Sequence, residues 1–160
     1  MITKQLTHPE SIVVVGGSND IQKPGGKILK NIIDGDFNGS LYVLNPKEEE
    51  IQGIKSYKNP DELPQTDLAI IAIAAKYTPD TVDFLASKKN TKAFIIISAG
   101  FSEESEEGKL LENRIVKKVN EVGGSLIGPN CVGVLTPQHH SVFTKPIPKL
   151  DTNGCDFISG

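Results

Sequence analysis

The chain has 160 residues, a length typical of one domain that can bury its own core. Its hydrophobic fraction of 38% and charged fraction of 23% are those of a globular protein. A net charge of −3 gives no electrostatic attraction for nucleic acid, and two cysteines are too few for a disulfide framework or a metal cluster. The sequence has no signal-peptide pattern and no apolar run of the ~20 residues that cross a bilayer. We therefore expect a cytoplasmic protein without nucleic-acid or membrane partners.

The first strong pattern is an apolar strand that runs into a glycine turn. Residues 12–16 are rich in β-branched side chains, which is typical of a strand buried on both faces. Gly16 and Gly17 then allow a tight turn and a close approach to a ligand. The Ser-Asn-Asp run at 18–20 offers oxygens that could cap a helix, and a helix start suits a phosphate. This pattern favours a ligand site over a plain turn.

Beyond this turn, strand and helix patterns alternate along the chain. Apolar residues at helical spacing follow Gly26, and the next helices begin at Thr78, which we expect to be a cap, and near Ser102. Further strands are predicted at 41–44, 68–73, 93–97 and 125–127. The alternation predicts a single α/β domain, a Rossmann-like, doubly wound parallel sheet. The carboxyl ends of its strands should meet at one edge, where such sheets bind ligands.

The C-terminal part of the chain has a different pattern. Residues 138–153 lose the helical periodicity and contain Pro146 and Pro148. The last residues, 155–160, resemble the beginning of another strand. We therefore expect residues 1–137 to form the domain, and residues 138–160 to form a linker or arm and the start of a following, truncated domain.

A dinucleotide is the first ligand to consider at the glycine turn. The usual fingerprint, G-x-G-x-x-G, is not met, because the glycines after Gly17 come only at 25 and 26. The end of the second strand carries Lys47 where an acidic residue would bind the ribose hydroxyls. A lysine there suits a nucleotide with an extra ribose phosphate, although a plain surface lysine is the simpler alternative. NAD(P) is therefore a minor alternative.

Few side chains are arranged for catalysis. His139 and His140 are adjacent and lack the spacing of metal ligands, so no metal site is expected. Cys131 follows a predicted strand in a glycine loop, but no histidine can be assigned as its partner. Ser98 is more typical of a residue that shapes the backbone. We expect no catalytic residue in this chain.

Four motifs taken together point to a known family. They are the strand ends and loops Val15-Gly16-Gly17-Ser18-Asn19, Asn45-Pro46-Lys47, Ile97-Ser98-Ala99-Gly100-Phe101 and Gly128-Pro129-Asn130-Cys131-Val132-Gly133. They resemble the N-terminal CoA-binding domain of NDP-forming acyl-CoA synthetases, which include ADP-forming acetate–CoA ligases and the succinyl-CoA ligase alpha subunit. The likeness covers about residues 10–137. Ala99 stands where the succinyl-CoA ligase branch carries an acidic residue, so the chain looks more like the acetate–CoA ligase branch.

The resemblance implies that coenzyme A lies along the strand ends. Lys47 matches a CoA-contacting lysine, and Asn130 and Cys131 match the loop near the thiol end of the pantetheine arm. The implied CoA-binding residues are Gly16, Gly17, Ser18, Asn19, Lys47, Ile73, Ala74, Ala75, Ile97, Ser98, Ala99, Asn130 and Cys131.

The family resemblance also implies a role within a larger enzyme. The domain would position the CoA thiol for acyl transfer from an acyl phosphate, and the phosphohistidine and ATP-grasp domains would be its partners. The fragment alone should be inactive. Two alternatives are a free-standing CoA-binding regulatory protein and the CoA-binding part of a fused lysine acetyltransferase.

Overall fold

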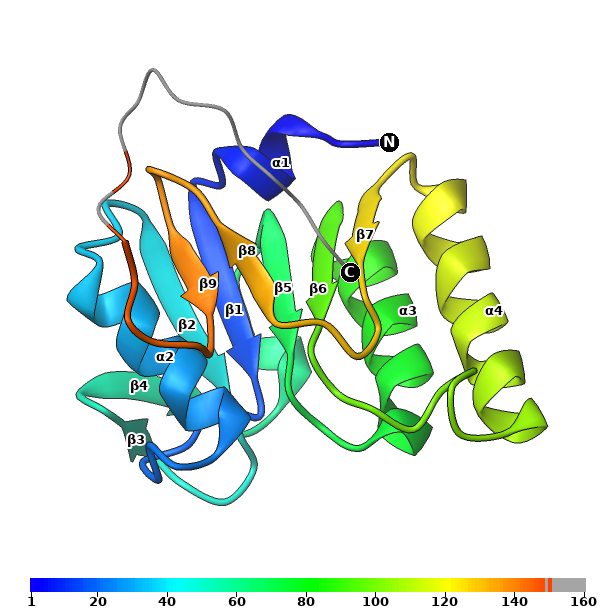
Figure 1. Cartoon of the computed structure of the whole chain (residues 1–160), viewed down its shortest axis with the longest axis horizontal. Coiled ribbons are helices and arrows are strands. Elements are labelled where there is room, and N and C mark those ends of the chain that lie inside the picture. The colour runs from blue at the N-terminus through cyan, green and yellow to red at the C-terminus, as the bar shows by residue number, and fades with distance from the viewer. Residues whose placement is uncertain (149, 151–160) are drawn as a thin grey trace.

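The structure is a computed structural model that describes residues 1–148 and 150. Seven strands form one sheet in the order β3-β4-β2-β1-β5-β6-β7, which crosses the centre of Figure 1. Neighbouring strands from β4 to β7 are parallel, and only the edge strand β3 is antiparallel to its neighbour. The strands are β1 (Ser11–Val15), β2 (Ser40–Leu44), β3 (Glu50–Ile51), β4 (Ile54–Tyr57), β5 (Leu68–Ile71), β6 (Ala93–Ile96) and β7 (Ser125–Ile127). The prediction of a Rossmann-like, doubly wound α/β domain is confirmed.

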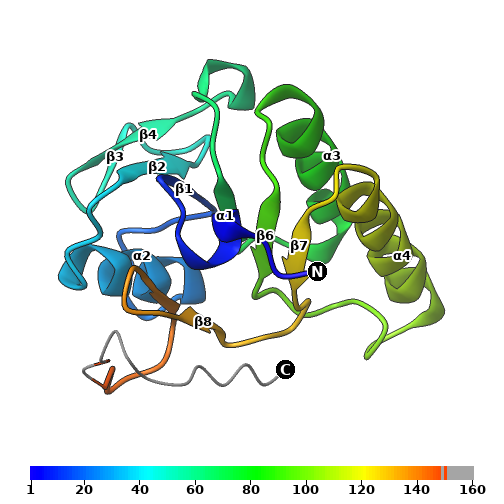
Figure 2. The same cartoon turned by 90° about the horizontal axis from the view of Figure 1, so that it is seen from above.

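Helices cover both faces of the sheet, as Figure 2 shows from above. Helix α2 (Pro24–Asp34) and a hairpin of β8 (Gly133–Leu135) and β9 (His140–Val142) lie on one face. Helices α3 (Thr78–Lys88) and α4 (Glu106–Glu121) lie on the other. The short elements are α1 (Lys4–Thr7) and the 3₁₀ turns η1 (Pro60–Glu62) and η2 (Ala75–Tyr77). Among residues 1–148 and 150, no helix is both long and apolar enough to cross a membrane.

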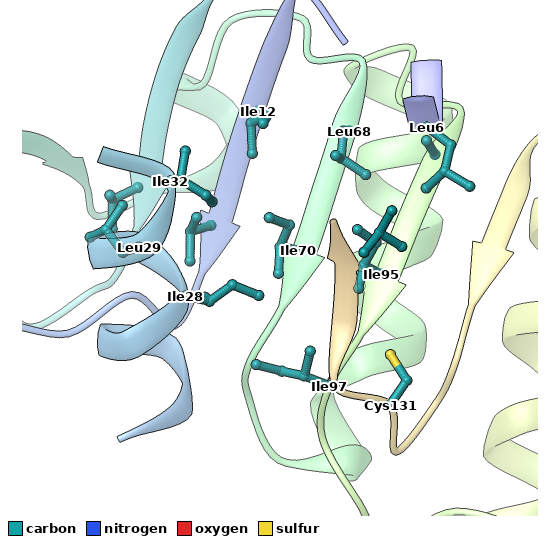
Figure 3. Packing of buried hydrophobic residues seen from close by; sticks show 14 of the residues in the cluster. Leu6, Ile12, Ile28, Leu29, Ile32, Leu68, Ile70, Ile95, Ile97 and Cys131 are labelled. Carbon is teal, nitrogen blue, oxygen red and sulfur yellow. The ribbon is translucent and has the colours of Figure 1, made fainter. Parts of the chain in front are cut away.

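Two apolar clusters hold the layers together, one on each face of the sheet. In β1, Ile12 and Val14 belong to the cluster under α2, whereas Val13 and Val15 belong to the cluster under α3 and α4. All four side chains are buried, which explains the unbroken β-branched run in the sequence. Figure 3 shows the first cluster, in which Ile28 of α2 lies over the strands.

Three local predictions about the helices were wrong. Helix α2 begins at Pro24, before the paired glycines, and its N-cap residue Lys23 makes no side-chain cap. Residues 18–20 therefore do not cap it; the Ser18 hydroxyl and the Asp20 carboxylate accept hydrogen bonds within the loop instead. Thr78 is the first residue of α3 rather than its cap, and its hydroxyl donates to the carbonyl of Ala74.

Two further differences concern α4 and the chain after residue 137. Leu110 follows the apolar spacing but is 70% exposed, because it falls at the edge of the stripe that packs on the sheet. Residues 140–142, which lie in the expected linker or arm, form β9 and pack against α2. The predicted strand start at 155–160 lies outside the described residues.

The hairpin is anchored by two buried polar side chains. Asn31 of α2 donates from Nδ2 to the carbonyl oxygen of Val142, 2.6 Å away. The His139 ring lies 2.8 Å from the carbonyl oxygen of Leu6 and 2.7 Å from the Ser141 hydroxyl. These contacts join the N-terminal segment, α2 and the hairpin into one layer.

Candidate functional site

The carboxyl ends of β1, β2 and β5 lie at the lower edge of the sheet in Figure 1. A cleft of about 620 Å³ is lined by residues at these ends. This is the edge where parallel α/β sheets bind ligands. The chain reverses its direction of winding between β1 and β5, so the crevice between their ends is open to a ligand. Its lining includes the glycine turn after β1, the Asn-Pro-Lys turn after β2, and the start of the loop after β5.

The glycine turn needs glycine because the backbone packs closely there. Gly16 has φ +83°, and a Cβ on it would lie 2.6 Å from the carbonyl oxygen of Ala72. A Cβ on Gly17 would lie 2.8 Å from a methyl group of Val43. The turn can therefore lie directly between the ends of β5 and β2, and its backbone rather than side chains lines the cleft.

Two more glycines in the first turn of α2 press against the same loop. A Cβ on Gly25 would lie 2.2 Å from the carbonyl oxygen of Gly16, and a Cβ on Gly26 would lie 2.1 Å from that of Asp20. Gly25 and Gly26 thus permit the close helix–loop packing that the third glycine supplies in the usual fingerprint. They do not match the fingerprint spacing because the loop between Gly17 and Gly25 is longer here.

The Asn-Pro-Lys turn is fixed by the Asn45 side chain. Its Nδ2 donates to the carbonyl oxygen of Gly17 at 2.9 Å, and its Oδ1 accepts from the backbone N–H of Lys47 at 2.9 Å. The backbone N–H of Asn45 donates to the carbonyl oxygen of Tyr57. The residue therefore ties together the ends of three neighbouring strands and sets where Lys47 enters the cleft.

Positive charge gathers at the cleft. Lys23, Lys47 and Lys58 line it, together with the carboxylate of Glu48. The ammonium group of Lys58 also lies 3.0 Å from Glu49, outside the cleft. Three cations beside the glycine turn suit a ligand that carries more than one anionic group. Sequence analysis identified only Lys47, because Lys23 stands in a loop and Lys58 follows the short strand β4, which was not among the predicted strands.

The structure separates the predicted site residues into two groups. Gly16, Gly17, Ser18, Lys47, Ile73 and Ala74 line the cleft. Asn19 is absent from the lining, and its side chain donates to Glu48, which does line the cleft, and to the backbone of Glu50. Ala75 begins η2, just beyond the lining.

The second group lies at the ends of β6 and β7, and comprises Ile97, Ser98, Ala99, Asn130 and Cys131. The backbone N–H of Asn130 donates to the carbonyl oxygen of Ser98 at 3.0 Å, so the two loops that carry these residues are joined. This group is not part of the cleft lining, and a ligand that touches both groups must extend along the sheet edge.

Cys131 is not prepared for nucleophilic attack. Its side chain is buried and its thiol lies 3.3 Å from the carbonyl oxygen of Ile96, to which it donates. Burial raises the pKa of the Cys131 thiol, which disfavours the reactive thiolate. Within the described residues, no group of three His, Cys, Asp or Glu side chains is placed to hold a metal ion.

The loop after β6 is shaped by a carboxylate that sequence analysis did not identify. Glu103 accepts hydrogen bonds from the backbone N–H groups of Gly100 and Phe101, at 2.7 and 3.2 Å. The Gly100 hydrogen bond is the main cause that lowers the pKa of Glu103, so the side chain is ionised at neutral pH. Glu103 thus orients the turn that follows Ala99.

Comparison with known proteins identifies the family of this chain. The CoA binding domain family matches residues 10–137, which include both groups of site residues. The chain belongs to the CoA binding domain family.

Two proteins to which the chain is similar are ADP-forming acetate–CoA ligases. The domain is 41% identical over 129 residues to the alpha subunit of acetate–CoA ligase [ADP-forming] II from Pyrococcus furiosus, a match that covers 80% of this chain and 28% of that subunit. It is 36% identical over 152 residues to acetate–CoA ligase [ADP-forming] II from Archaeoglobus fulgidus, covering 94% of this chain and 22% of that enzyme.

A solved structure agrees with this assignment. The dinucleotide-forming acetyl-coenzyme A synthetase 1 of Ca. Korarchaeum cryptofilum, in complex with phosphate and ADP, superposes with a TM-score of 0.81 at 30% identity. The match covers 94% of this chain and 32% of the synthetase chain. The CoA-binding domain thus resembles one part of ADP-forming acetate–CoA ligases, and it spans less than a third of the length of the two ligase chains that it matches.

Proposed function

We propose that this domain binds coenzyme A along the carboxyl ends of its strands, as the CoA-binding part of an ADP-forming acyl-CoA synthetase of the acetate–CoA ligase type. The observation that carries the proposal is the cleft in which a glycine turn and three lysines meet, in a chain of the CoA binding domain family. CoA carries a pyrophosphate and a ribose phosphate, and both need such donors.

The two groups of site residues suit the two ends of CoA. The cleft between β1, β2 and β5 offers the cations and the glycine turn, so it would hold the phosphorylated nucleotide end. The uncharged pantetheine arm would run along the sheet edge to the joined loops after β6 and β7. There Ser98 and Asn130 would lie near the thiol end, and the buried Cys131 would support the loop from beneath.

The chemical contribution of the domain would be placement of the thiol. In the whole enzyme, the CoA sulfur would attack the carbonyl carbon of an acyl phosphate, forming the thioester bond and releasing phosphate. Holding the thiol in line with that carbon lowers the entropic part of the barrier without any proton transfer by this domain. The phosphohistidine and ATP-grasp domains, as partners, would supply the acyl phosphate.

Calorimetry on the chain tests the binding proposal directly. CoA should bind with one molecule per chain, and NADH, which lacks the ribose phosphate and the pantetheine arm, should give no heat above dilution. Binding of NADH without binding of CoA would overturn the proposal. Mixing residues 1–160 with acetate, CoA and ATP should give no acetyl-CoA, because they span less than a third of the length of the two ligase chains that they match.

A further inference from the structure

The glycine loop is held from its outer side by a residue of the β3–β4 hairpin. Gln52 lies at the tip of that hairpin with φ +51°, next to Gly53. Its side-chain Nε2 donates to the carbonyl oxygen of Ser18 at 2.8 Å and to that of Gly26 at 2.9 Å. One amide thus bridges the middle of the loop and the first turn of α2.

The backbone of the hairpin tip is bonded to the same loop. The N–H of Gln52 donates to Oδ1 of Asn19 at 2.8 Å, and Nδ2 of Asn19 donates in turn to Glu48 and to the carbonyl of Glu50. Asn19 and Gln52 thus connect the loop and the hairpin in both directions. Among the residues that the structure describes, only the Gln52 side chain bonds to the backbone of both the loop and the first turn of α2.

The orientation of the Gln52 amide is fixed by its partners. Two carbonyl oxygens need a donor with two hydrogens, which only the NH₂ group provides. The Oε1 atom is consequently buried, and no hydrogen-bond partner for it exists within residues 1–148 and 150. An unmade hydrogen bond at a buried oxygen is unfavourable, so the two bonds at Nε2 and the packing around them must offset it.

These contacts determine the direction of the loop peptides. The peptide between Ser18 and Asn19 is planar, so fixing the carbonyl of Ser18 also fixes the N–H of Asn19 on its opposite side. Asn45 fixes the preceding peptide from the other side of the loop. Its hydrogen bond holds the carbonyl of Gly17, and therefore also sets the direction of the N–H of Ser18. Both carbonyls face the protein, and their partner N–H groups are turned away from these contacts.

We propose that Gln52 is a positioning residue for phosphate binding, which holds the glycine loop in the conformation that presents its N–H groups to the pyrophosphate of CoA. The inference rests on the proposed function, because the phosphate-bearing ligand is the one assigned there. Gln52 itself makes no contact with the ligand, since it is absent from the cleft lining.

Gln52→Met tests the role with a side chain of similar length that has no donor. CoA and dephospho-CoA both carry the pyrophosphate, so the affinity for each should fall by about tenfold and by the same factor. A merely structural role in the hairpin would also disturb Lys47, which precedes it, and would change the ratio of the two affinities. Gln22→Met, on the same loop, is the matched control and should bind both ligands like the original chain.

Gln52→Glu provides a second readout within a single folded protein. Its carboxylate would face two carbonyl oxygens without a proton to donate, whereas the protonated acid can donate to one of them. CoA affinity relative to the original chain should therefore recover as the pH falls from about 8 to about 5. Gln22→Glu adds the same charge without these contacts and should show a much smaller recovery.

The outcomes separate this inference from the proposed function. If the original chain does not bind CoA, the proposed function fails. If it binds CoA and Gln52→Met binds both ligands within twofold of it, the positioning role is wrong. Equal recoveries in the two glutamate variants would also overturn it, because repulsion by charge alone would then explain the pH dependence.

Discussion

The side-chain amide of Asn45 donates a hydrogen bond to the carbonyl oxygen of Gly17, 2.9 Å away. This bond joins the end of β2 to the glycine turn after β1, and the oxygen of the same side chain accepts from the N–H of Lys47. The two parts of the cleft that suit phosphates are therefore coupled through one residue. A change at Asn45 is expected to affect both.

Asn45→Asp separates the two hydrogen bonds of this residue. Aspartate can still accept from the Lys47 N–H but cannot donate to the carbonyl of Gly17, which it would instead repel. Calorimetry should show CoA affinity reduced by about tenfold, with dephospho-CoA reduced to a similar extent. Asn113→Asp, on the exposed surface of α4, adds the same charge far from the cleft and should bind CoA normally. Normal binding by Asn45→Asp would contradict the coupling.

Lys47→Ala tests which phosphate the lysine meets. If Lys47 pairs with the ribose 3′-phosphate, the variant should lose about tenfold in affinity for CoA and far less for dephospho-CoA, which lacks that group. The preference of the original chain for CoA over dephospho-CoA should also weaken as the salt concentration is raised, because salt screens the charge of an exposed lysine. Lys88→Ala, on an exposed part of α3, is the control. Equal losses for the two ligands would remove the assigned role.

Gly26→Ala should destabilise the fold even though alanine is a better helix former. The helical preference favours alanine by about 1 kcal/mol, but its Cβ would lie 2.1 Å from the carbonyl oxygen of Asp20. Since backbone must move to relieve this contact, we expect a net loss of about 2 kcal/mol in the free energy of unfolding, measured by urea titration.

Gly53→Ala serves as the comparison for that substitution. Gly53 has φ +80°, and apart from Gly53 and its two chain neighbours no described residue has an atom within 4 Å of the place that an alanine methyl group would take. Only backbone strain of about 1 kcal/mol is therefore added. If Gly26→Ala proves less damaging than Gly53→Ala, the close packing of α2 on the loop is not a constraint.

His139 should make the fold sensitive to mild acid. Burial is the main cause that lowers the pKa of His139 to about 4, from 6.5 for an exposed histidine. Below pH 6.5, His139 is protonated in the unfolded chain but stays neutral in the folded chain down to about pH 4. The free energy of unfolding therefore falls as the pH decreases from about 6.5 to about 4, by up to ~1.4 kcal/mol per pH unit. Above pH 6.5 this contribution is constant.

Urea titrations across this pH range measure the effect. His139→Gln should lower stability at neutral pH, because it disturbs the contacts with Leu6 and Ser141, and it should flatten the dependence between pH 6.5 and 4. His8→Gln removes an exposed histidine whose charge is only a minor cause of the lowered pKa of His139, so it should change the dependence little. An unchanged slope in His139→Gln would assign the acid sensitivity to carboxylates elsewhere.

The core of the fold was predictable because each buried strand carries its own signal. Continuous β-branched runs such as Ile12–Val15 identify strands covered on both faces, and helical spacing identified the three long helices between them. The predictions for Leu110 and for Thr78 as a cap were wrong. An apolar stripe can shift by one turn, and a capping position by one residue, without any change in the sequence pattern.

The candidate site was predictable only where a motif marks a strand end. Gly16, Gly17 and Lys47 follow strands directly, so topology alone brings them together. Lys58 lines the cleft and Gln52 bonds to the glycine loop, both from the short edge hairpin, and no periodicity indicates which way such a hairpin folds. The β8–β9 hairpin was missed for a related reason, since its strands have three residues each and its buried His139 is unusual for a strand boundary.

That hairpin has a consequence for how the domain can be divided. The family match ends at residue 137, yet His139 contacts Leu6, and Val142 accepts the hydrogen bond from Asn31. A fragment cut at 137 would uncover the outer surface of α2 and leave a buried amide without its partner. We therefore expect the unit that folds cooperatively to extend past residue 137, and the smallest autonomous fragment to include β9.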